Sequence, residues 1–328
     1  MKALRWGVIG TGGIAAAFVR DLAWLPDADV VAVGSRAQES ADRFAAAHGL
    51  ERGHASYEDL VGDDAVDVVY VATPHPLHVS AAMLAIEAGK AVLVEKPFTI
   101  DAGEAESLVS AARSRGTFLM EAMWTRFLPH MRRIRALLAA GALGEVRTVV
   151  AEHGQWFAQD AEHRLFAPAL GGGALLDLGI YPVSFVSMVL GAPERVTAVS
   201  SPAFTGVDAT TSILLEHAGG AHGVVTTSLE AAGANAVSIS GTEARVVVEP
   251  TWYRPAVFSL LARDGTVLER FDEPHQGHGL RHQAEEVARC LRDGRTESDV
   301  MPLDETLSIM RTLDEVRRQI GLAYPPTT

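Results

Sequence analysis

The 328-residue sequence has a single cysteine, Cys290, so no disulfide bond can form within one chain. This scarcity fits a reducing compartment, and we expect a cytoplasmic protein. Cys290 lies among apolar positions of residues 283–291, which indicates a core residue rather than a catalytic or metal-binding thiol. The first residues also lack the apolar region and cleavage site of a signal peptide, and we expect no apolar run of bilayer length.

Positive charge is also scarce, since 28 basic side chains stand against 41 acidic ones and the net charge is −13. Nucleic-acid-binding surfaces need clustered positive charge, so this class of protein is excluded. An anionic ligand must therefore be held by local features and not by the overall field. No repeat or low-complexity tract is present, and a hydrophobic content of 48% predicts a globular protein with a sizeable core.

A glycine-rich turn near the start of the chain is the most informative motif. An apolar strand at residues 4–9 leads into Gly10, Gly12 and Ala15, which have the G-x-G-x-x-A spacing of a dinucleotide-binding fingerprint, and a helix is expected at 14–25. The first glycine permits a tight turn, the second lets the backbone approach a pyrophosphate, and the helix N-terminus binds the phosphates. The predicted cofactor contacts in this turn are Gly10, Thr11, Gly12, Gly13 and Ile14.

The order of expected elements indicates two domains, as the length also does. The first 120 residues alternate strands and helices, which predicts an α/β Rossmann fold with a doubly wound parallel sheet at residues 1–122. Successive strands separated by turns predict an α+β domain at 123–328. We expect strands at 4–9, 30–33, 66–72, 91–94, 117–120, 146–153, 196–200, 210–216, 223–229, 236–240, 245–249, 256–261 and 266–271, and helices at 14–25, 38–48, 77–88, 101–115, 173–190, 282–292 and 303–320.

The end of the second expected strand indicates which dinucleotide is bound. An acidic residue at this position accepts a hydrogen bond from the ribose 2′-hydroxyl of NAD, but here the strand is followed by Ser35 and Arg36. A serine hydroxyl and an arginine fork suit a 2′-phosphate, so we expect NADP(H) to be preferred, with NAD(H) possible. The alternative is that Arg36 is a solvated loop residue.

Two segments follow expected strands and belong to the ligand-binding edge of the sheet. Thr73, Pro74 and His78 come after the strand at 66–72, and Glu95-Lys96-Pro97 come after the strand at 91–94. A lysine at this edge can hold and polarise a substrate oxygen, whereas the alternative is an ordinary surface lysine. No H-E-x-x-H motif or carboxylate-rich set accompanies the histidines, so we expect no metal site.

Residues 171–182 form the second segment with potential chemistry. In a helix, Asp177 and Tyr181 would lie on one face, four positions apart. Pro182 predicts a kink or a late start of the helix. A tyrosine near the Lys96 ammonium could exchange a proton with a carbinol while a hydride moves to or from a nicotinamide. The alternative is a helix-capping aspartate and a packed tyrosine.

These motifs together resemble the glucose–fructose oxidoreductase/inositol dehydrogenase/MocA family over nearly the whole chain. The resemblance rests on Gly-Val-Ile-Gly-Thr-Gly-Gly-Ile-Ala at 7–15, on Thr73-Pro74 with His78, on Glu95-Lys96-Pro97, and on Gly172-Gly173 through Tyr181. Residues 121–127, 177–182 and 321–325 resemble the branch that contains dimeric dihydrodiol dehydrogenase and NADP-dependent xylose dehydrogenase. Many relatives have a histidine at the position of Tyr181, and this departure supports the same branch.

The resemblance implies a Rossmann domain followed by a domain with a large, open-faced, mostly antiparallel sheet. The outer face of that sheet would form the interface of a homodimer, or of a dimer of dimers. The resemblance also implies a catalytic Lys96–Tyr181 pair and a cis Lys96–Pro97 bond. Further expected contacts are Trp124 and Arg126 for the cofactor, Lys96, Trp124, Phe157, Asp177 and Tyr181 for the substrate, and, more weakly, His153 and residues 278–280 for the pocket wall.

The sequence therefore predicts an NADP-dependent oxidoreductase that transfers a hydride between a nicotinamide and a carbinol or carbonyl carbon. The expected substrate is a small sugar, polyol or trans-dihydrodiol, and neither nucleic acid nor a membrane is an expected partner. Lys96 would orient the reacting oxygen, Tyr181 would act as general acid and base, and Asp177 would support them. The alternatives are a non-catalytic NADP-binding sensor and a glycosidase that uses bound NAD.

Overall fold

The computed structural model describes residues 3–325, which fall into two compact units. The first unit comprises the chain through Trp124 together with Gln276–Leu307. The second comprises Thr125–His275 and the residues from Ser308 onward. The chain first passes from one unit to the other after Trp124, two residues beyond the expected boundary at 122/123. Residues 276–307 were expected in the second domain but belong to the first unit.

Contacts distant in sequence explain this difference. The buried carboxylate of Asp21 accepts hydrogen bonds from the backbone N–H groups of His278, at 3.0 Å, and Leu280, at 2.7 Å. The N–H of Leu119 donates to the carbonyl of Thr296 at 3.1 Å. No local sequence pattern predicts such contacts, so periodicity could not assign residues 276–307 to the first unit.

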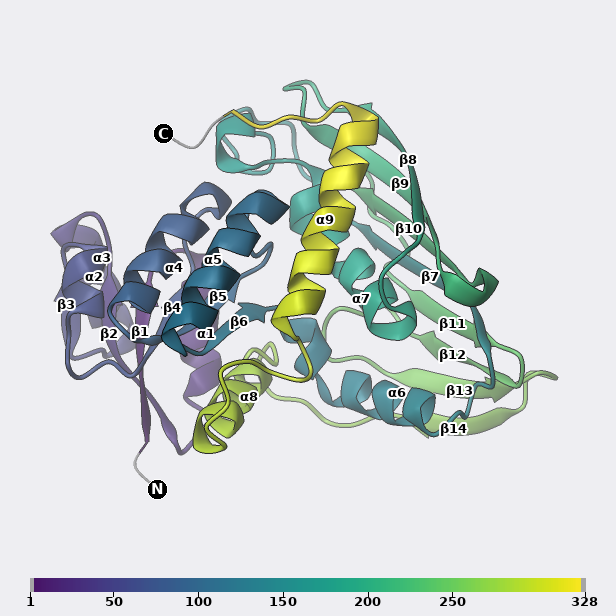
Figure 1. Ribbon diagram of the computed structural model, residues 1–328, viewed down its shortest axis with the longest axis horizontal. Helices are drawn as coiled ribbons and strands as arrows, with labels where there is room; N and C mark the ends of the chain where they lie inside the picture. Colours follow the sequence, from purple (N-terminus) through teal and green to yellow (C-terminus); the bar gives the residue numbers. More distant parts are fainter. Residues whose placement is uncertain (1–2, 326–328) are drawn as a thin grey trace. The chain divides into compact units, whose positions relative to one another are not determined.

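The first unit is built on a six-stranded parallel sheet with the order β3-β2-β1-β4-β5-β6 (Figure 1). The central strands are continuous apolar runs, as expected for a sheet covered on both faces. The order reverses between β1 and β4, where open α/β sheets bind their ligands. The elements of this unit are β1 (Leu4–Ile9), α1 (Gly13–Leu22), β2 (Ala28–Gly34), α2 (Gln38–His48), β3 (Arg52–His54), α3 (Tyr57–Val61), β4 (Val68–Val71), η1 (His75–Leu77), α4 (His78–Glu87), β5 (Ala91–Glu95), α5 (Ala102–Arg115), β6 (Leu119–Ala122) and α8 (Arg281–Arg292).

The second unit is built on an eight-stranded sheet with the order β14-β13-β12-β11-β7-β10-β9-β8. All neighbouring strands are antiparallel except β7 and β10. Helices α6, α7 and α9 lie on one side of this sheet, and the other side is open (Figure 1). Its elements are α6 (Pro129–Ala139), β7 (Val146–Gly154), η3 (Pro168–Leu170), η4 (Leu175–Gly179), α7 (Ile180–Leu190), β8 (Arg195–Pro202), β9 (Asp208–Glu216), η5 (Ala218–Gly220), β10 (His222–Ser228), β11 (Val237–Gly241), β12 (Ala244–Val248), β13 (Phe258–Ala262) and β14 (Val267–Phe271), while η2 (Trp124–Phe127) and α9 (Leu303–Ile320) begin in the first unit and end in the second.

The predicted fold class is thus confirmed, and several boundaries are too. Helices α2 and α9 begin and end at the predicted residues. Helix α5 starts with the predicted capping box, in which the Glu104 N–H donates to Asp101 and the Glu104 carboxylate accepts from the Ile100 N–H. The sequence analysis missed β3, α3 and α6. Helix α6 could have been found, because Met131, Ile134 and Leu137 recur every three residues and are buried.

A wide helical turn precedes the helix that carries Tyr181. Residues Leu175–Gly179 form a π-helical turn, and α7 begins at Ile180 with Pro182 in its first turn. Proline is tolerated there because the first N–H groups of a helix have no intrahelical partner. The helix therefore begins late, as the proline predicted.

The buried carboxylate of Asp208 holds the start of this turn. Its Oδ2 accepts hydrogen bonds from the Leu175 N–H and the Thr211 hydroxyl, both at 2.8 Å. Burial raises the pKa of Asp208 to about 7, although these two donors favour the charged form. The phenol of Tyr324 donates to the carbonyl of Gly172 nearby, at 2.6 Å.

One stretch, Pro168–Leu190, is long and apolar enough to cross a membrane by length and composition alone, and the mean hydropathy of its most apolar window is 1.7. The expectation that no apolar run reaches that length is therefore wrong. However, 78% of its most apolar window is buried inside the protein, as in the core helix of a globular domain. The stretch is thus weak evidence for a membrane span.

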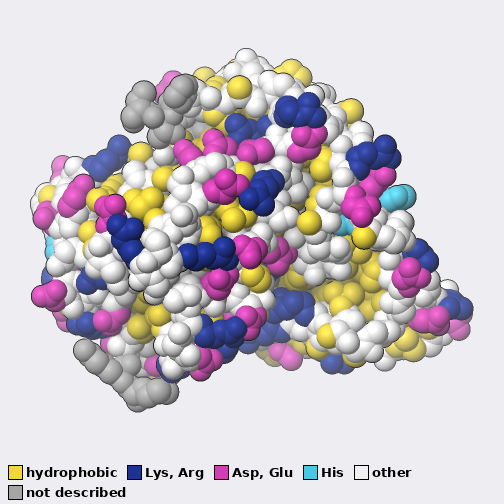
Figure 2. Space-filling model, in the orientation of Figure 1, with side chains coloured by type: hydrophobic (Ala, Val, Ile, Leu, Met, Phe, Trp, Pro, Cys, Tyr) yellow, Lys and Arg dark blue, Asp and Glu magenta, His cyan; other side chains and the backbone are white. Residues whose placement is uncertain are grey.

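Acidic and basic side chains lie beside one another on the face drawn in Figure 2. Helix α9 carries two ion pairs, in which Arg317 pairs with Asp314 and Arg318 pairs with Glu315. On this face the charges are mixed and not separated by sign.

Replacement of Asp208 should change how stability depends on pH. The folded-state pKa is raised from 3.8 to about 7, so the folded protein holds this proton more tightly than the unfolded chain does. Its stabilising effect is complete below about pH 4 and is lost as the pH rises through 7. The free energy of unfolding of the wild type, relative to Asp208→Asn, should fall by about 1 kcal/mol per pH unit between pH 5 and 7.

Urea unfolding of both proteins at pH 5, 6 and 7 measures this difference. Asp264→Asn is the matched control, because Asp264 is fully exposed and its pKa is lowered, so its difference from the wild type should not vary over this range. A constant difference between the wild type and Asp208→Asn would contradict the prediction.

Candidate functional site

The glycine turn after β1 has the geometry that the fingerprint predicts. Gly10 has φ of +110°, and a Cβ atom there would lie 2.6 Å from the carbonyl oxygen of Ala72, so only glycine fits. Gly12 and Gly13 are exposed, and a Cβ on either would meet nothing within 4 Å. Gly12 is the N-cap of α1 and provides no side-chain cap. The first N–H groups of this ten-residue helix therefore face open space, as phosphate binding requires.

A polar atom beside this turn also fits a bound dinucleotide. The Thr73 hydroxyl lies just past the carboxyl end of β4 and is buried, with no hydrogen-bond partner among residues 3–325. A buried hydroxyl without a partner is costly, and a ligand oxygen would satisfy it. The uncapped helix and this hydroxyl together suit the phosphates of a nicotinamide dinucleotide.

The end of β2 carries the residues expected to distinguish the two dinucleotides. The strand ends at Gly34, and the backbone N–H of Ser35 donates to the carbonyl of His54 at 3.1 Å. The Arg36 side chain is exposed. A guanidinium group at this position can bind a phosphate with two parallel hydrogen bonds.

Buried groups fix the backbone at Lys96. The Tyr70 hydroxyl donates to Oε1 of Glu95 at 2.5 Å, and the backbone N–H of Lys96 donates to Oε2 at 3.1 Å. Glu95 is buried and Lys96 is half-buried. The Lys96–Pro97 bond is cis, which confirms the expectation drawn from the family. Glu95 thus holds the backbone of Lys96 in place at the carboxyl end of β5.

His78 joins the two strand ends that were predicted to meet at the ligand edge. Its Nδ1 lies 2.9 Å from the carbonyl oxygen of Pro97, and its Nε2 lies 3.0 Å from that of Thr73. Burial lowers the pKa of His78, although the carbonyls favour the protonated ring. The sequence analysis expected His78 to contact the cofactor, whereas in the structure both ring nitrogens face protein carbonyls and link the two turns.

In the second unit, Asp177 faces an arginine from the preceding loop. Nη1 and Nη2 of Arg164 donate to its two carboxylate oxygens at 2.9 and 3.2 Å. The Asp177 side chain is 6% exposed and that of Arg164 is 53% exposed, so the pair joins a buried carboxylate to a surface guanidinium. The bidentate contact favours the ionised carboxylate, and the sequence analysis did not foresee it.

Tyr181 lies in an aromatic cluster with His153 and Tyr253. The His153 and Tyr253 rings stack at a centroid distance of 3.8 Å, the His153 and Tyr181 rings meet edge to face at 5.1 Å, and the two phenol rings are 5.7 Å apart. Nε2 of Gln155 lies 2.8 Å from Nε2 of His153 and 3.2 Å from the Tyr253 oxygen. His153 was a predicted pocket residue, but Tyr253 and Gln155 were missed.

The remaining predicted contacts have structural partners. Trp124 is buried in η2. The buried guanidinium of Arg126 donates to the hydroxyl and the carbonyl of Ser184 on α7, at 3.0 and 2.6 Å. Phe157 packs against the hydrophobic cluster around Leu165 and Leu178. These contacts explain how the segments are anchored and leave the predicted ligand contacts of these side chains untested.

Comparison with known proteins identifies the family. The model of the oxidoreductase family with an NAD-binding Rossmann fold, GFO_IDH_MocA, matches residues 4–123, and the model of the GFO/IDH/MocA C-terminal domain matches residues 131–247. The chain belongs to the GFO/IDH/MocA oxidoreductase family. The resemblance stated from sequence motifs is therefore confirmed.

Full-length relatives place the chain more closely within this family. It is 41% identical to trans-1,2-dihydrobenzene-1,2-diol dehydrogenase from Bos taurus and 40% identical to the Homo sapiens protein of that name, in each case over 98% of both chains. Among solved structures, aldose–aldose oxidoreductase from Caulobacter crescentus in complex with glycerol has a TM-score of 0.88 at 26% identity, covering 98% of both chains. The 3-ketoreductase KijD10 from Actinomadura kijaniata, in complex with NADP and TDP-benzene, has a TM-score of 0.85 at 29% identity, covering 97% of this chain and 98% of the other. This family member is thus an NAD(P)-dependent oxidoreductase that acts on CH–OH groups.

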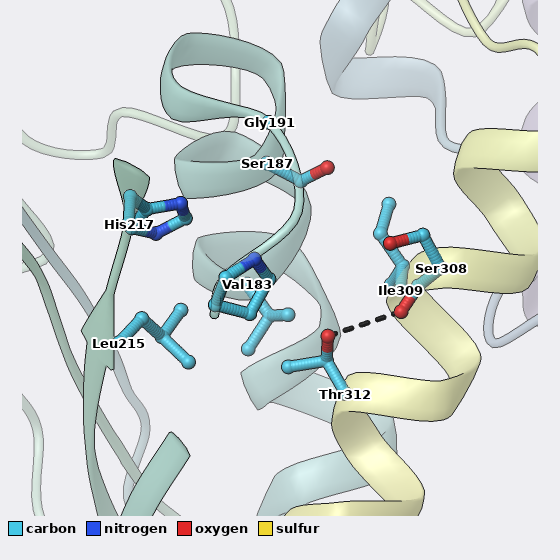
Figure 3. A pocket seen from close by; sticks show the side chains of 9 residues that line it. Val183, Ser187, Gly191, Leu215, His217, Ser308, Ile309 and Thr312 are labelled. Atoms are coloured by element: carbon cyan, nitrogen blue, oxygen red, sulfur yellow. Dashed lines mark hydrogen bonds between the residues drawn. The ribbon is translucent and has the colours of Figure 1, made fainter. Parts of the chain in front are cut away.

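Two other hollows contain none of the predicted site residues. A cavity of about 10 Å³ in the second unit lies among α7, β9 and α9, with Ser187, His217 and Thr312 on its wall (Figure 3). It is large enough for one water molecule at most. A groove of about 510 Å³ in the first unit follows α5 and includes Val109 and Arg113.

Cys290 is buried, and burial raises the pKa of its thiol to about 12, which confirms the predicted core role. Among residues 3–325, no group of three or more His, Cys, Asp or Glu side chains could hold a metal ion.

Proposed function

We propose that this protein is an NADP-dependent dehydrogenase of a small polyhydroxy substrate, namely a sugar, a polyol or a trans-dihydrodiol. The observation that carries the proposal is the position of Lys96 at the carboxyl end of β5, where the buried Glu95 accepts a hydrogen bond from the Lys96 backbone N–H. The same sheet carries the glycine turn that leads into the uncapped start of α1. The full-length similarity to trans-1,2-dihydrobenzene-1,2-diol dehydrogenases supports the substrate class.

The proposed mechanism gives Lys96, Tyr181 and Asp177 distinct tasks. The Lys96 ammonium binds the reacting oxygen and stabilises negative charge on it. In oxidation the Tyr181 phenolate accepts the proton of that oxygen as general base, and in reduction the Tyr181 phenol returns it as general acid. The Asp177 carboxylate accepts a hydrogen bond from a substrate hydroxyl. A nicotinamide, when bound, accepts or supplies the hydride, and the proposal requires Lys96 and Tyr181 to reach the same substrate oxygen.

The preference for NADP over NAD is supported by Ser35 and Arg36 after β2, where no carboxylate is available to bind a ribose 2′-hydroxyl. The neighbour KijD10 is in complex with NADP, which also supports it. The predicted contacts of the remaining fingerprint residues, of Thr73-Pro74 and of Trp124 belong to the same proposal.

The open face of the second sheet supports a homodimer. Seven neighbouring strands, from β8 to β13 in the sheet order, each place one residue in a row of paired positions, and none of these residues is charged. The row includes Leu214, Val224 and Val150, which are 39, 38 and 43% exposed. Exposed apolar surface on a sheet face is typical of an interface. The proposed partner is therefore a second copy of this chain. The proposed compartment is the cytoplasm, because a single, buried cysteine fits a reducing environment, and cell fractionation would check it.

Replacement of Arg36 tests the cofactor preference. Arg36→Ala should lower the ratio of kcat/KM with NADP to kcat/KM with NAD by about 10- to 100-fold, because charged hydrogen bonds to the 2′-phosphate are lost. Arg43→Ala is the matched control, since Arg43 lies exposed on α2 and pairs with Glu39, and its ratio should equal that of the wild type. Equal ratios in Arg36→Ala and the wild type would remove the assignment.

Replacement of Lys96 or Tyr181 tests the catalytic pair. Lys96→Met and Tyr181→Phe should each lower kcat by about 100-fold or more in a screen of aldoses, cyclitols and trans-dihydrodiols, while NADPH affinity by fluorescence stays within about threefold. Lys90→Met is the control, because the Lys90 ammonium donates to the carbonyls of Asp63 and Val66. It should lower the melting temperature and keep kcat, and near-normal turnover of Lys96→Met would refute the mechanism.

A charge on the open sheet face tests the dimer. Leu214→Arg should convert the protein from a dimer to a monomer in sedimentation velocity, because an unpaired charge would be buried at the interface. Trp24→Arg changes a residue that is also exposed, at 55%, but lies after α1 in the other unit, and it should stay dimeric. A monomeric wild type, or a dimeric Leu214→Arg protein, would contradict the proposal.

A further inference from the structure

The carbonyl oxygen of Leu178, in the turn before α7, fixes the tautomer of His153. Pro182, four residues later, has no N–H group and cannot donate to this carbonyl. Nδ1 of His153 lies 3.2 Å from this carbonyl oxygen. A carbonyl oxygen only accepts hydrogen bonds, so Nδ1 carries the hydrogen, and in the neutral ring Nε2 is an acceptor.

This tautomer sets the orientation of the Gln155 amide. The amide atom 2.8 Å from Nε2 of His153 must be a donor, which makes it the NH₂ group. The same nitrogen lies 3.2 Å from the Tyr253 oxygen, so its second hydrogen points to that oxygen. The Tyr253 oxygen therefore accepts a hydrogen bond, and its own hydrogen is directed elsewhere.

The hydroxyl hydrogen of Tyr253 is available to a ligand. Within residues 3–325 no acceptor lies within hydrogen-bond distance of it, although the Tyr253 side chain is only 7% exposed. Burial raises the pKa of Tyr253, and the neighbouring Tyr181 raises it further, so the phenol stays protonated at neutral pH. Gln155 is half-buried, so the network reaches the surface of the unit.

We propose that the Tyr253 hydroxyl donates a hydrogen bond to a second substrate oxygen, adjacent to the carbinol that reacts at Tyr181. The centroids of the two phenol rings are 5.7 Å apart, so one small compound can contact both rings. Gln155 and His153 act as positioning residues that hold Tyr253 as a donor. This inference rests on the proposed function and narrows its substrates to compounds with adjacent hydroxyl groups.

Binding of two simple probes to the full-length protein tests the inference without turnover. Trans-cyclohexane-1,2-diol and cyclohexanol differ by one hydroxyl group, and neither can be oxidised by protein saturated with NADPH. Calorimetric titration gives the dissociation constant of each. The wild type should bind the diol about tenfold more tightly than cyclohexanol, as one hydrogen bond in a buried site implies.

Two variants should reduce this preference to different degrees. Tyr253→Phe keeps the ring that stacks on His153 and should reduce the preference to about onefold. Gln155→Leu should reduce it partly, because the hydroxyl remains but is no longer held. Tyr57→Phe, which removes a phenol from α3 in the other unit, is the matched control and should behave as the wild type. Melting temperatures close to that of the wild type would show that the variants are folded.

The outcomes separate this inference from the proposed function. A wild-type preference below twofold, or an unchanged preference in Tyr253→Phe, would overturn the role of Tyr253. A purely structural Tyr253 would lower the melting temperature and leave the preference unchanged, which also counts against the inference. Oxidation of the diol with NADP is measured in parallel. If the wild type binds the diol selectively but never oxidises any polyol, the proposed function fails while the donor role of Tyr253 stands.

Discussion

The close approach of Gly10 to the carbonyl of Ala72 is the constraint on which the first unit depends. It places the turn after β1 directly against the end of β4, at 2.6 Å from where a Cβ would lie, and so no other residue can replace this glycine without moving backbone. The same turn aims the uncapped start of α1 into open space beside the buried hydroxyl of Thr73. Sheet packing and dinucleotide binding are therefore two consequences of one tight turn.

In the second unit a comparable constraint comes from the carbonyl of Leu178. Nδ1 of His153 donates to this carbonyl, so Nε2 of the neutral ring accepts a hydrogen bond from the Gln155 amide. The wide turn at Leu175–Gly179 supplies the geometry, and Asp208 holds its start. Irregular helical turns cost stability and often occur at functional sites, which fits a turn that carries Asp177 and leads into Tyr181.

The sequence predicted what depends on local spacing and failed where a partner lies far along the chain. The fingerprint, the Asp101 capping box and the start of α7 follow from residues within a few positions of one another. The link between His78 and Pro97 spans 19 residues, that between Arg126 and Ser184 spans 58, and that between Gln155 and Tyr253 spans 98. Periodicity carries no information about such pairs, so side chains assigned to ligands proved to have protein partners as well.

In the proposed site, Asp177 and Tyr253 are complementary groups, one an acceptor and one a donor. An ionised carboxylate has about four lone-pair positions, so two hydrogen bonds from Arg164 do not by themselves exhaust its capacity as an acceptor. Arg164 also favours the charged form, which cannot donate. Tyr253 behaves in the opposite way, because its oxygen already accepts from Gln155 and its hydrogen can only be donated. A hydroxyl group both donates and accepts, so in the proposed site one fixed acceptor and one fixed donor together would select a compound with several hydroxyls over one with a single hydroxyl.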